Sequence, residues 1–253
     1  MTSPTPLPRN SGCLRSKALL AVLVMALPGG APAGQPTAGT VVLIHGLGRT
    51  NRSMWALERE AKRRGYAAIN WRYASTQGTV AEHAASLHRE LSTRLQHSPG
   101  PVHFVTHSLG GIVLRAYLGR HTLSNIGRVV MLAPPNQGSE VADQLADWWG
   151  FQWLLGPAGQ ELRTDSARGP IRYAPVAAEV GIIAGSRSTN PVFSRWIGGP
   201  NDGKVAVARA RLDGMRDFLV VPYPHALLAW QREVLQQTFA FLVDGAFTRK
   251  GQP

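Results

Sequence analysis

The chain contains 253 residues, of which 44% are hydrophobic and 17% are charged. This composition is typical of a folded globular protein and excludes an intrinsically disordered one. The formal net charge is +12, but outside Lys62-Arg63-Arg64 the basic residues are dispersed, with no stripe of interleaved aromatic residues. The charge therefore indicates a solvated surface and not a nucleic-acid-binding face, with weak attraction to anionic membrane surfaces as the alternative.

The first 33 residues differ from the rest of the chain. Three basic residues precede an apolar stretch at 18–27, which is followed by a Pro/Gly break and by Ala31-Pro32-Ala33. This layout is typical of a secretory signal peptide and predicts a secreted or periplasmic protein that is cleaved near Ala33. An uncleaved N-terminal anchor is the alternative, although the stretch is short for a membrane span. The remaining domain, 34–253, contains no cysteine and so has no disulfide or thiol chemistry.

From residue 40 onward, apolar runs alternate with helical patterns. The predicted strands are 41–44, 66–71, 102–105, 129–132, 181–184 and 218–221, and the predicted helices are 53–64, 80–95, 110–120 and 226–243. This order predicts an α/β domain with a mostly parallel sheet and helices on both of its faces.

The alternation lapses between residues 134 and 180, which predicts a cap-like insertion. Aromatic and leucine side chains crowd this segment, and we expect Trp149, Trp153 and Leu154 to contact the substrate. Ligand pockets are lined mostly by hydrophobic and aromatic side chains, which supports this interpretation. The alternative is that these side chains simply pack a connecting helix onto the domain.

The pentapeptide Thr106-His107-Ser108-Leu109-Gly110 follows the predicted strand at 102–105 and predicts a sharp turn into a helix. Such a turn exposes one serine hydroxyl as a nucleophile and needs small residues two positions before and after the serine. Gly110 meets this requirement, whereas Thr106 meets it only in part. The alternative is a serine that caps an ordinary helix.

A second glycine-rich turn, His45-Gly46-Leu47-Gly48, follows the first predicted strand. It could direct the backbone N–H of Leu47 to the same sheet edge as the serine. Together with the N–H of Leu109, it would form an oxyanion hole with two donors. A plain glycine turn is the alternative.

A serine nucleophile needs an imidazole base and a carboxylate that orients it, in the chain order Ser, acid, His in this kind of fold. His225 lies after the last predicted strand and is the histidine that fits this order. Asp202, in a turn-rich loop, is the preferred acid. Asp213 and Asp217 are competitors, but they lead directly into the last strand.

Together these segments resemble the α/β-hydrolase superfamily, and most of all its small bacterial lipases and esterases. The resemblance covers about 41–243 and includes the Asp-Gly-x-Val pattern at 202–205 and the x-Gly-Ser pattern at 136–139. It implies that Ser108 is the nucleophile, Asp202 the acid and His225 the base. Thr106 stands where glycine is commoner in such enzymes.

The sequence thus predicts a serine hydrolase of carboxylic esters that acts on a small-molecule or lipid ester without a metal or cofactor. The histidines at 83, 88, 97 and 103 do not follow zinc-ligand spacings. A thioesterase, amidase or acyltransferase with the same triad is the nearest alternative. A binding protein with decayed catalytic machinery on the same fold is the alternative from another class.

Overall fold

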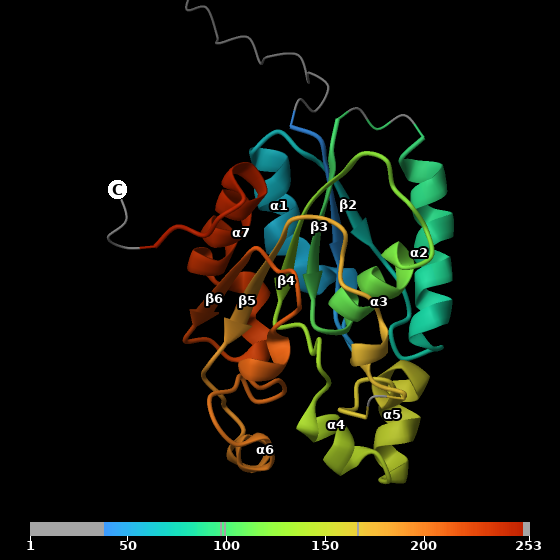
Figure 1. Ribbon diagram of the computed structural model, residues 1–253, viewed down its shortest axis with the longest axis vertical. Helices are drawn as coiled ribbons and strands as arrows, with labels where there is room; N and C mark the ends of the chain where they lie inside the picture. Colours follow the sequence, from blue (N-terminus) through green and yellow to red (C-terminus); the bar gives the residue numbers. More distant parts are fainter. Residues whose placement is uncertain (1–37, 97, 99, 166, 250–253) are drawn as a thin grey trace, which may run out of the picture. The chain divides into compact units, whose positions relative to one another are not determined.

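The computed structural model describes residues 38–96, 98, 100–165 and 167–249, so the predicted signal peptide lies outside the described residues. Six strands form one sheet in the order β2-β1-β3-β4-β5-β6, and every neighbouring pair is parallel (Figure 1). The strands are β1 (Thr40–Ile44), β2 (Ala67–Trp71), β3 (Val102–His107), β4 (Ile126–Leu132), β5 (Val180–Gly185) and β6 (Asp217–Val221). All six predicted strands are therefore present, and the parallel sheet is confirmed.

Helices cover both faces of this sheet (Figure 1). One apolar core lies between the sheet and the helices α2 (Val80–Arg94) and α3 (Leu109–Leu118). A second core lies on the opposite face, under α1 (Trp55–Arg63) and α7 (Arg232–Asp244). Because both faces are covered, β3 and β5 are buried along their whole length, as their apolar sequences require.

The carboxyl ends of the strands all lie at one edge of the sheet. In Figure 1 this edge is at the bottom, where α4 (Glu140–Leu145), α5 (Trp149–Gln160) and α6 (Pro191–Ile197) are found. The strand order reverses beside β1, which has β2 on one side and β3 on the other. In open α/β sheets, such a reversal opens a crevice for ligands at the carboxyl edge.

Two predicted helices begin later than the sequence suggested. The first opens with the 3₁₀ turn η1 (Asn51–Met54), and α1 starts at Trp55. The last is preceded by the 3₁₀ helix η4 (His225–Trp230), which ends where Gln231 adopts an extended backbone with φ −75° and ψ 130°. Residues 226–230 are mostly good helix formers, so local propensity does not reveal this break.

The segment after β4 holds three short elements, α4, α5 and the 3₁₀ turn η2 (Pro170–Arg172). α5 is kinked at Gly156, where φ is 65° and an added Cβ would lie 1.9 Å from the Thr76 carbonyl oxygen. Hydrogen bonds join this segment to the start of α2, from Ala158 N to Gly78 O at 3.0 Å and from Val80 N to Glu161 Oε1 at 3.0 Å.

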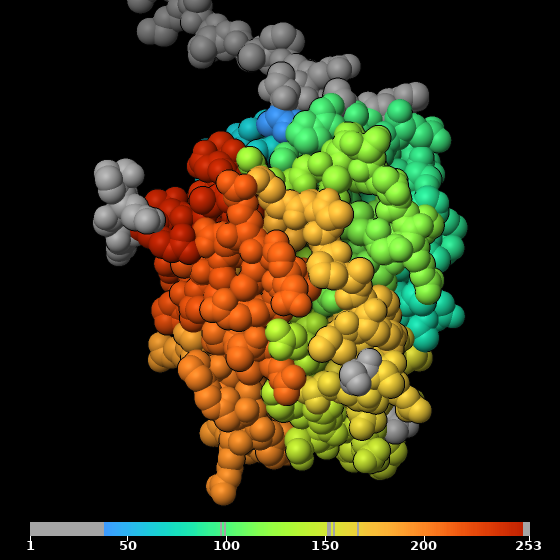
Figure 2. Space-filling view, viewed as in Figure 1, coloured from blue at the N-terminus to red at the C-terminus, as the bar shows by residue number. Residues whose placement is uncertain are grey.

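The segment after β4 also meets the chain that leads into β6, as the adjoining yellow-green and orange surfaces in Figure 2 show. An ion pair of 2.8 Å joins Arg209 to Glu140 across this boundary. Within the described residues, no helix combines the length and the hydropathy that a membrane span needs.

Gly110 marks the closest approach between α3 and the end of β1. A Cβ added there would lie 2.4 Å from the Ile44 carbonyl oxygen and 2.8 Å from that of His45. Both are backbone atoms, so β1 and α3 would have to move apart to admit a methyl group.

We therefore expect Gly110→Ala to lower the free energy of unfolding by about 1–3 kcal/mol, the range for overpacked sites. The matched control is Gly119→Ala at the end of the same helix, where φ is −70° and the nearest contact of an added Cβ is 3.3 Å. That change should alter stability by less than about 1 kcal/mol. Urea denaturation of both variants measures the difference, and equal stability would contradict the proposed clash.

Candidate active site

Ser108 lies between the end of β3 and the start of α3, with φ 54° and ψ −124°. β3 extends to His107, two residues beyond the predicted strand end, so the turn into the helix falls on the serine itself. A positive φ costs a non-glycine residue on the order of 1–3 kcal/mol, and such strain is found mostly at functional sites. The sharp turn predicted from the pentapeptide is present.

The side chain of Thr106 is accommodated because the helix residue that faces it, Gly111, has no side chain. The Thr106 side chain is fully buried, and an added Cβ at Gly111 would lie 3.3 Å from its Oγ1. The same added Cβ would lie 3.2 Å from Pro134 Cβ. The small residue that the turn lacks at position 106 is thus offset by Gly111 in the facing helix.

The loop at 45–48 packs against the serine turn. A Cβ added at Gly46 would lie 3.0 Å from both Ser108 Cβ and His107 Nδ1, so only glycine fits there without displacement. The Tyr73 hydroxyl donates a 2.8 Å hydrogen bond to the carbonyl of His45. The Gly48 N–H donates a 3.0 Å bond to Ser75 Oγ. The chain after β2 therefore fixes the loop that carries Leu47.

The two predicted oxyanion donors lie in favourable backbone positions. Leu109 is the first residue of α3, and the N–H groups of a helix's first turn have no partner within the helix. Leu47 lines the same cavity as Ser108.

His225 and Asp202 are joined by a buried hydrogen bond of 2.7 Å between Nδ1 and Oδ2. The other carboxylate oxygen accepts from the N–H groups of Lys204 and Val205, at 2.9 and 2.8 Å. Because an ionised carboxylate only accepts hydrogen bonds, Nδ1 of His225 carries the proton. Nε2 is then the acceptor nitrogen of the neutral ring. The backbone N–H of His225 also donates a 3.0 Å hydrogen bond to the backbone carbonyl of Asp202.

The end of β5 lets these loops approach each other. A Cβ added at Gly185 would lie 2.8 Å from Asp202 Cβ and 2.4 Å from the carbonyl oxygen of Tyr223. From the other side, the Ser139 hydroxyl donates a 2.6 Å bond to the carbonyl of Lys204. The x-Gly-Ser pattern thus has a structural role, because its serine holds the loop that carries Asp202.

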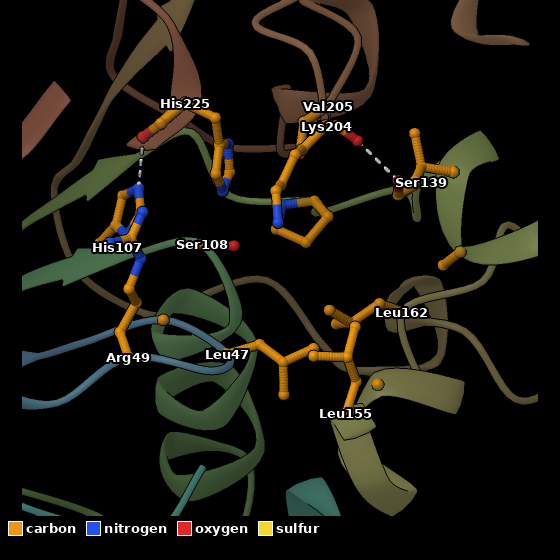
Figure 3. A pocket seen from close by; sticks show the side chains of 15 residues that line it. Leu47, Arg49, His107, Ser108, Ser139, Leu155, Leu162, Lys204, Val205 and His225 are labelled. Carbon is orange, nitrogen blue, oxygen red and sulfur yellow. Dashed lines mark hydrogen bonds between the residues drawn. The ribbon is translucent and has the colours of Figure 1, made fainter. Parts of the chain in front are cut away.

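Ser108 and His225 line one cavity at the carboxyl edge of the sheet. Figure 3 shows the His225 imidazole directed toward the Ser108 hydroxyl oxygen. Apolar side chains form much of the remaining wall, namely Leu47, Val141, Ala142, Leu155 and Leu162. The arrangement places an alcohol, an imidazole and a buried carboxylate in series beside an apolar wall.

His107 holds the backbone of His225 in place through a hydrogen bond. Its Nε2 donates a 3.0 Å hydrogen bond to the His225 carbonyl, and the two rings lie 4.8 Å apart. Burial lowers the pKa of His107 well below its usual 6.5, and the nearby His225 lowers it further. A neutral His107 therefore holds the loop without adding positive charge beside the imidazole.

The rival acids lie away from His225. Asp217 forms an ion pair with Arg249 and accepts from the N–H of Phe247, while Asp213 is exposed. The structure brings Asp202, and neither competitor, into contact with the imidazole.

Two predicted substrate-binding residues of α5, Trp149 and Trp153, lie outside the cavity wall. Trp149 and Trp153 are 76% and 82% exposed, and neither lines the cavity. The Leu154 side chain is outside the described part of the structure. Leu155 lines the cavity and approaches the loop at 45–48, where a Cβ added at Gly48 would lie 3.7 Å from its Cδ2. A substrate contact by the two tryptophans stays a prediction.

Within the described residues, no three His, Cys, Asp or Glu side chains gather in a way that could hold a metal ion. The nearest approach of such groups at the site is the Asp202–His225 pair.

The sequence from 41 to 243 matches the model of the α/β hydrolase family. The chain belongs to this family. No curated protein matches it at a significant level.

Solved structures of other hydrolases share the fold of this α/β hydrolase. The mature lipase BlEst2 of Bacillus licheniformis superposes with a TM-score of 0.66 and 21% identity over 84% of this chain and 96% of its own. Its propeptide form gives a TM-score of 0.68 with 20% identity over 90% of this chain, which spans about half (54%) of that form. A metagenomic carboxyl esterase gives 0.59 with 20% identity, covering 79% of this chain and 68% of its own.

Several residues of the hydrolase site are missed by reading the sequence. Tyr73 and Ser75 follow β2 and carry no motif, yet both anchor the loop at 45–48. Arg49 and Lys204 also line the cavity, although each lies in or beside a predicted motif without a recognised role in it. Glycines at 46 and 48 signal that some close contact exists, but only the fold shows which residues make it.

The Tyr73 hydroxyl can be tested by its removal. Tyr73→Phe leaves the carbonyl of the fully buried His45 without this donor, so we expect a loss of about 1–2 kcal/mol in the free energy of unfolding. The matched control is Tyr223→Phe, whose hydroxyl makes a solvent-exposed bond to Glu233 and should matter by less than about 0.5 kcal/mol. Chemical denaturation compares the two, and an equal effect would refute a specific anchoring role.

Proposed function

We propose that this α/β hydrolase is a serine hydrolase that cleaves carboxylic esters, with Ser108 as nucleophile, His225 as base and Asp202 as acid. The observation that carries the proposal is the buried 2.7 Å hydrogen bond between Asp202 and His225, beside a strained serine in the same cavity. A serine hydroxyl is a weak nucleophile at neutral pH and needs this kind of partner.

In the first half of the reaction, the Ser108 oxygen attacks the ester carbonyl while Nε2 of His225 accepts the hydroxyl proton. Collapse of the tetrahedral intermediate breaks the bond to the alcohol, which takes that proton and leaves an acyl-enzyme. A water molecule then attacks the acyl carbon by the same route, and the carboxylic acid leaves. Asp202 fixes the tautomer and stabilises the imidazolium in both halves.

The N–H groups of Leu47 and Leu109 are assigned to the oxyanion. Their support is positional, because one lies in the loop packed on Ser108 and the other begins the helix after it. Each such donor contributes on the order of 3 kcal/mol to stabilisation of the transition state. The contacts of Gly46, Tyr73 and Ser75 hold the first donor loop in place.

The substrate is proposed to be a small-molecule or lipid ester with a partly apolar acyl group. The apolar wall of the cavity supports this, as do the lipase and carboxyl esterase that share the fold. A secreted or periplasmic location is proposed on the sequence of residues 1–33 alone.

The nucleophile is tested with a fluorophosphonate probe, which reacts covalently with activated serines. Ser108→Ala should abolish labelling of the purified protein. Ser139→Ala, which removes another serine of the cavity, should keep the label at a reduced rate because the Asp202 loop loses one support.

Mass spectrometry of the labelled peptide identifies the reacting residue. Labelling of the Ser108→Ala variant at a different serine would overturn the assignment. Turnover of matched p-nitrophenyl ester, thioester and anilide substrates then separates an esterase from a thioesterase or an amidase, since the serine turn fixes the nucleophile and not the leaving group.

The acyl wall is tested on α5 with two substitutions. Leu155→Ala should lower kcat/KM for p-nitrophenyl octanoate relative to acetate by about tenfold, because it removes apolar contact from a long chain only. Trp153→Ala is the matched change at an exposed position of the same helix. A fall in the same ratio for this variant would support the sequence-based prediction of a tryptophan contact, and no change in either variant would place the acyl group elsewhere.

A further inference from the structure

Two cationic side chains, Arg49 and Lys204, line the cavity together with Ser108. Arg49 follows the loop at 45–48, and Lys204 lies two residues after Asp202. Among the residues that the structure describes, neither cation has a carboxylate within ion-pair distance. No Asp or Glu is among the described residues that line this cavity.

Asp202 contacts His225 of the cavity wall, but both of its carboxylate oxygens are already engaged. It is 3% exposed, and its two oxygens accept from the His225 imidazole and from the N–H groups of Lys204 and Val205. The charge of Asp202 acts on Lys204 at a distance, but its oxygens are occupied, and it forms no ion pair with the ammonium of Lys204 or the guanidinium of Arg49.

A second cavity adjoins the first and is also basic. It shares Arg49 and Leu155 with the first cavity and adds Arg72, and no described acidic residue lines it. Some arginines are paired, for example Arg128 with Glu179 and Arg209 with Glu140. Others on the described surface, such as Arg52 and Arg232, have no ion pair either, so what distinguishes Arg49 and Lys204 is their place in the cavity of Ser108.

The positive charges of Arg49 and Lys204 act on each other and on the neighbouring His107. Surrounding protein atoms and Arg49 lower the pKa of Lys204, which Asp202 raises in part, and both cations lower the pKa of His107. Both side chains are exposed, so solvent screens part of this repulsion, and an anion bound near both would gain from two positive charges at once.

The two cations lie on different sides of the Ser108 hydroxyl. In Figure 3, Arg49 lies to its left next to His107, Lys204 lies above and to its right, and Leu47, Leu155 and Leu162 lie below and to its right. A substrate whose acyl chain contacts the leucines would thus direct another of its groups toward a cation.

We propose that Arg49 and Lys204 form a binding site for an anionic group of the substrate, a carboxylate or a phosphate close to the scissile ester. This inference rests on the proposed ester hydrolysis and narrows its substrate class to anionic esters. Arginine suits both anions because its planar guanidinium matches their paired oxygens, and lysine adds a point charge.

Two matched substrate pairs test the proposal in the full chain. For an anion on the acyl side, the pair is the mono-p-nitrophenyl ester of glutaric acid against p-nitrophenyl valerate, which have acyl chains of equal length. For an anion on the alcohol side, the pair is butyrylglycerol phosphate against monobutyrin. The readout is the ratio of kcat/KM for the anionic ester to that for the neutral ester, at low salt and below any aggregation of substrate.

Arg49→Gln and Lys204→Gln should each lower this ratio about fivefold in at least one pair, the effect of one exposed charge pair. Raising the salt concentration should lower the ratio of the unsubstituted protein toward that of the variants. The control is Arg52→Gln, which removes an equal charge three residues from Arg49 at an exposed position outside the cavity, and which should leave the ratio unchanged.

The pair in which the ratio falls identifies the side of the ester that carries the anion. Unchanged ratios in both pairs for both variants would overturn the anion site, as would an equal fall for Arg52→Gln. These outcomes are separate from failure of the proposed function, which would appear as no turnover of any ester and no fluorophosphonate labelling by the unsubstituted protein.

Discussion

The close contact between the end of β1 and the Ser108 turn is the constraint on which the site depends. Gly46 and Gly110 make this contact possible, because a Cβ at either position would meet Ser108, Ile44 or His45 at 3.0 Å or less. The contact sets the strained backbone of Ser108 and the position of the loop that carries Leu47. β1 and β3 pair in register up to Ile44 and Thr106, so the two turns leave the sheet at the same level.

A second contact of the same kind completes the site from the other half of the sheet. Gly185 ends β5 and lets the loops of Asp202 and His225 approach each other, while His107 donates to the His225 carbonyl across the gap between β3 and β6. His107, which precedes Ser108 in the sequence, thus supports His225 through a hydrogen bond. The stability of the sheet and the geometry of the site are therefore properties of the same few backbone contacts.

Much of this could be predicted from sequence because the relevant signals are local. Strand periodicity located all six strands, and residue type with chain order led to Ser108, Asp202 and His225, the last two of which the structure joins by a hydrogen bond. Contacts between segments distant in sequence could not be predicted. Tyr73, Ser75 and Ser139 hold the active-site loops through single hydrogen bonds that no pattern marks. Trp149 and Trp153 are exposed, and the kink of the same helix at Gly156 lies against the Thr76 carbonyl, a contact that no composition reveals.

The anion site proposed at Arg49 and Lys204 has opposite effects on the two charges that ester attack creates. Positive charge at the cavity favours the developing oxyanion but disfavours the imidazolium of His225. Asp202 offsets the second effect, since its buried carboxylate oxygen lies 2.7 Å from Nδ1 of His225. An anionic substrate group would neutralise the cations while it is bound, and so would lower their opposition to proton transfer. In this proposal, the charge of the substrate acts on the proposed base as well as on binding, through the two cations that line the cavity with Ser108.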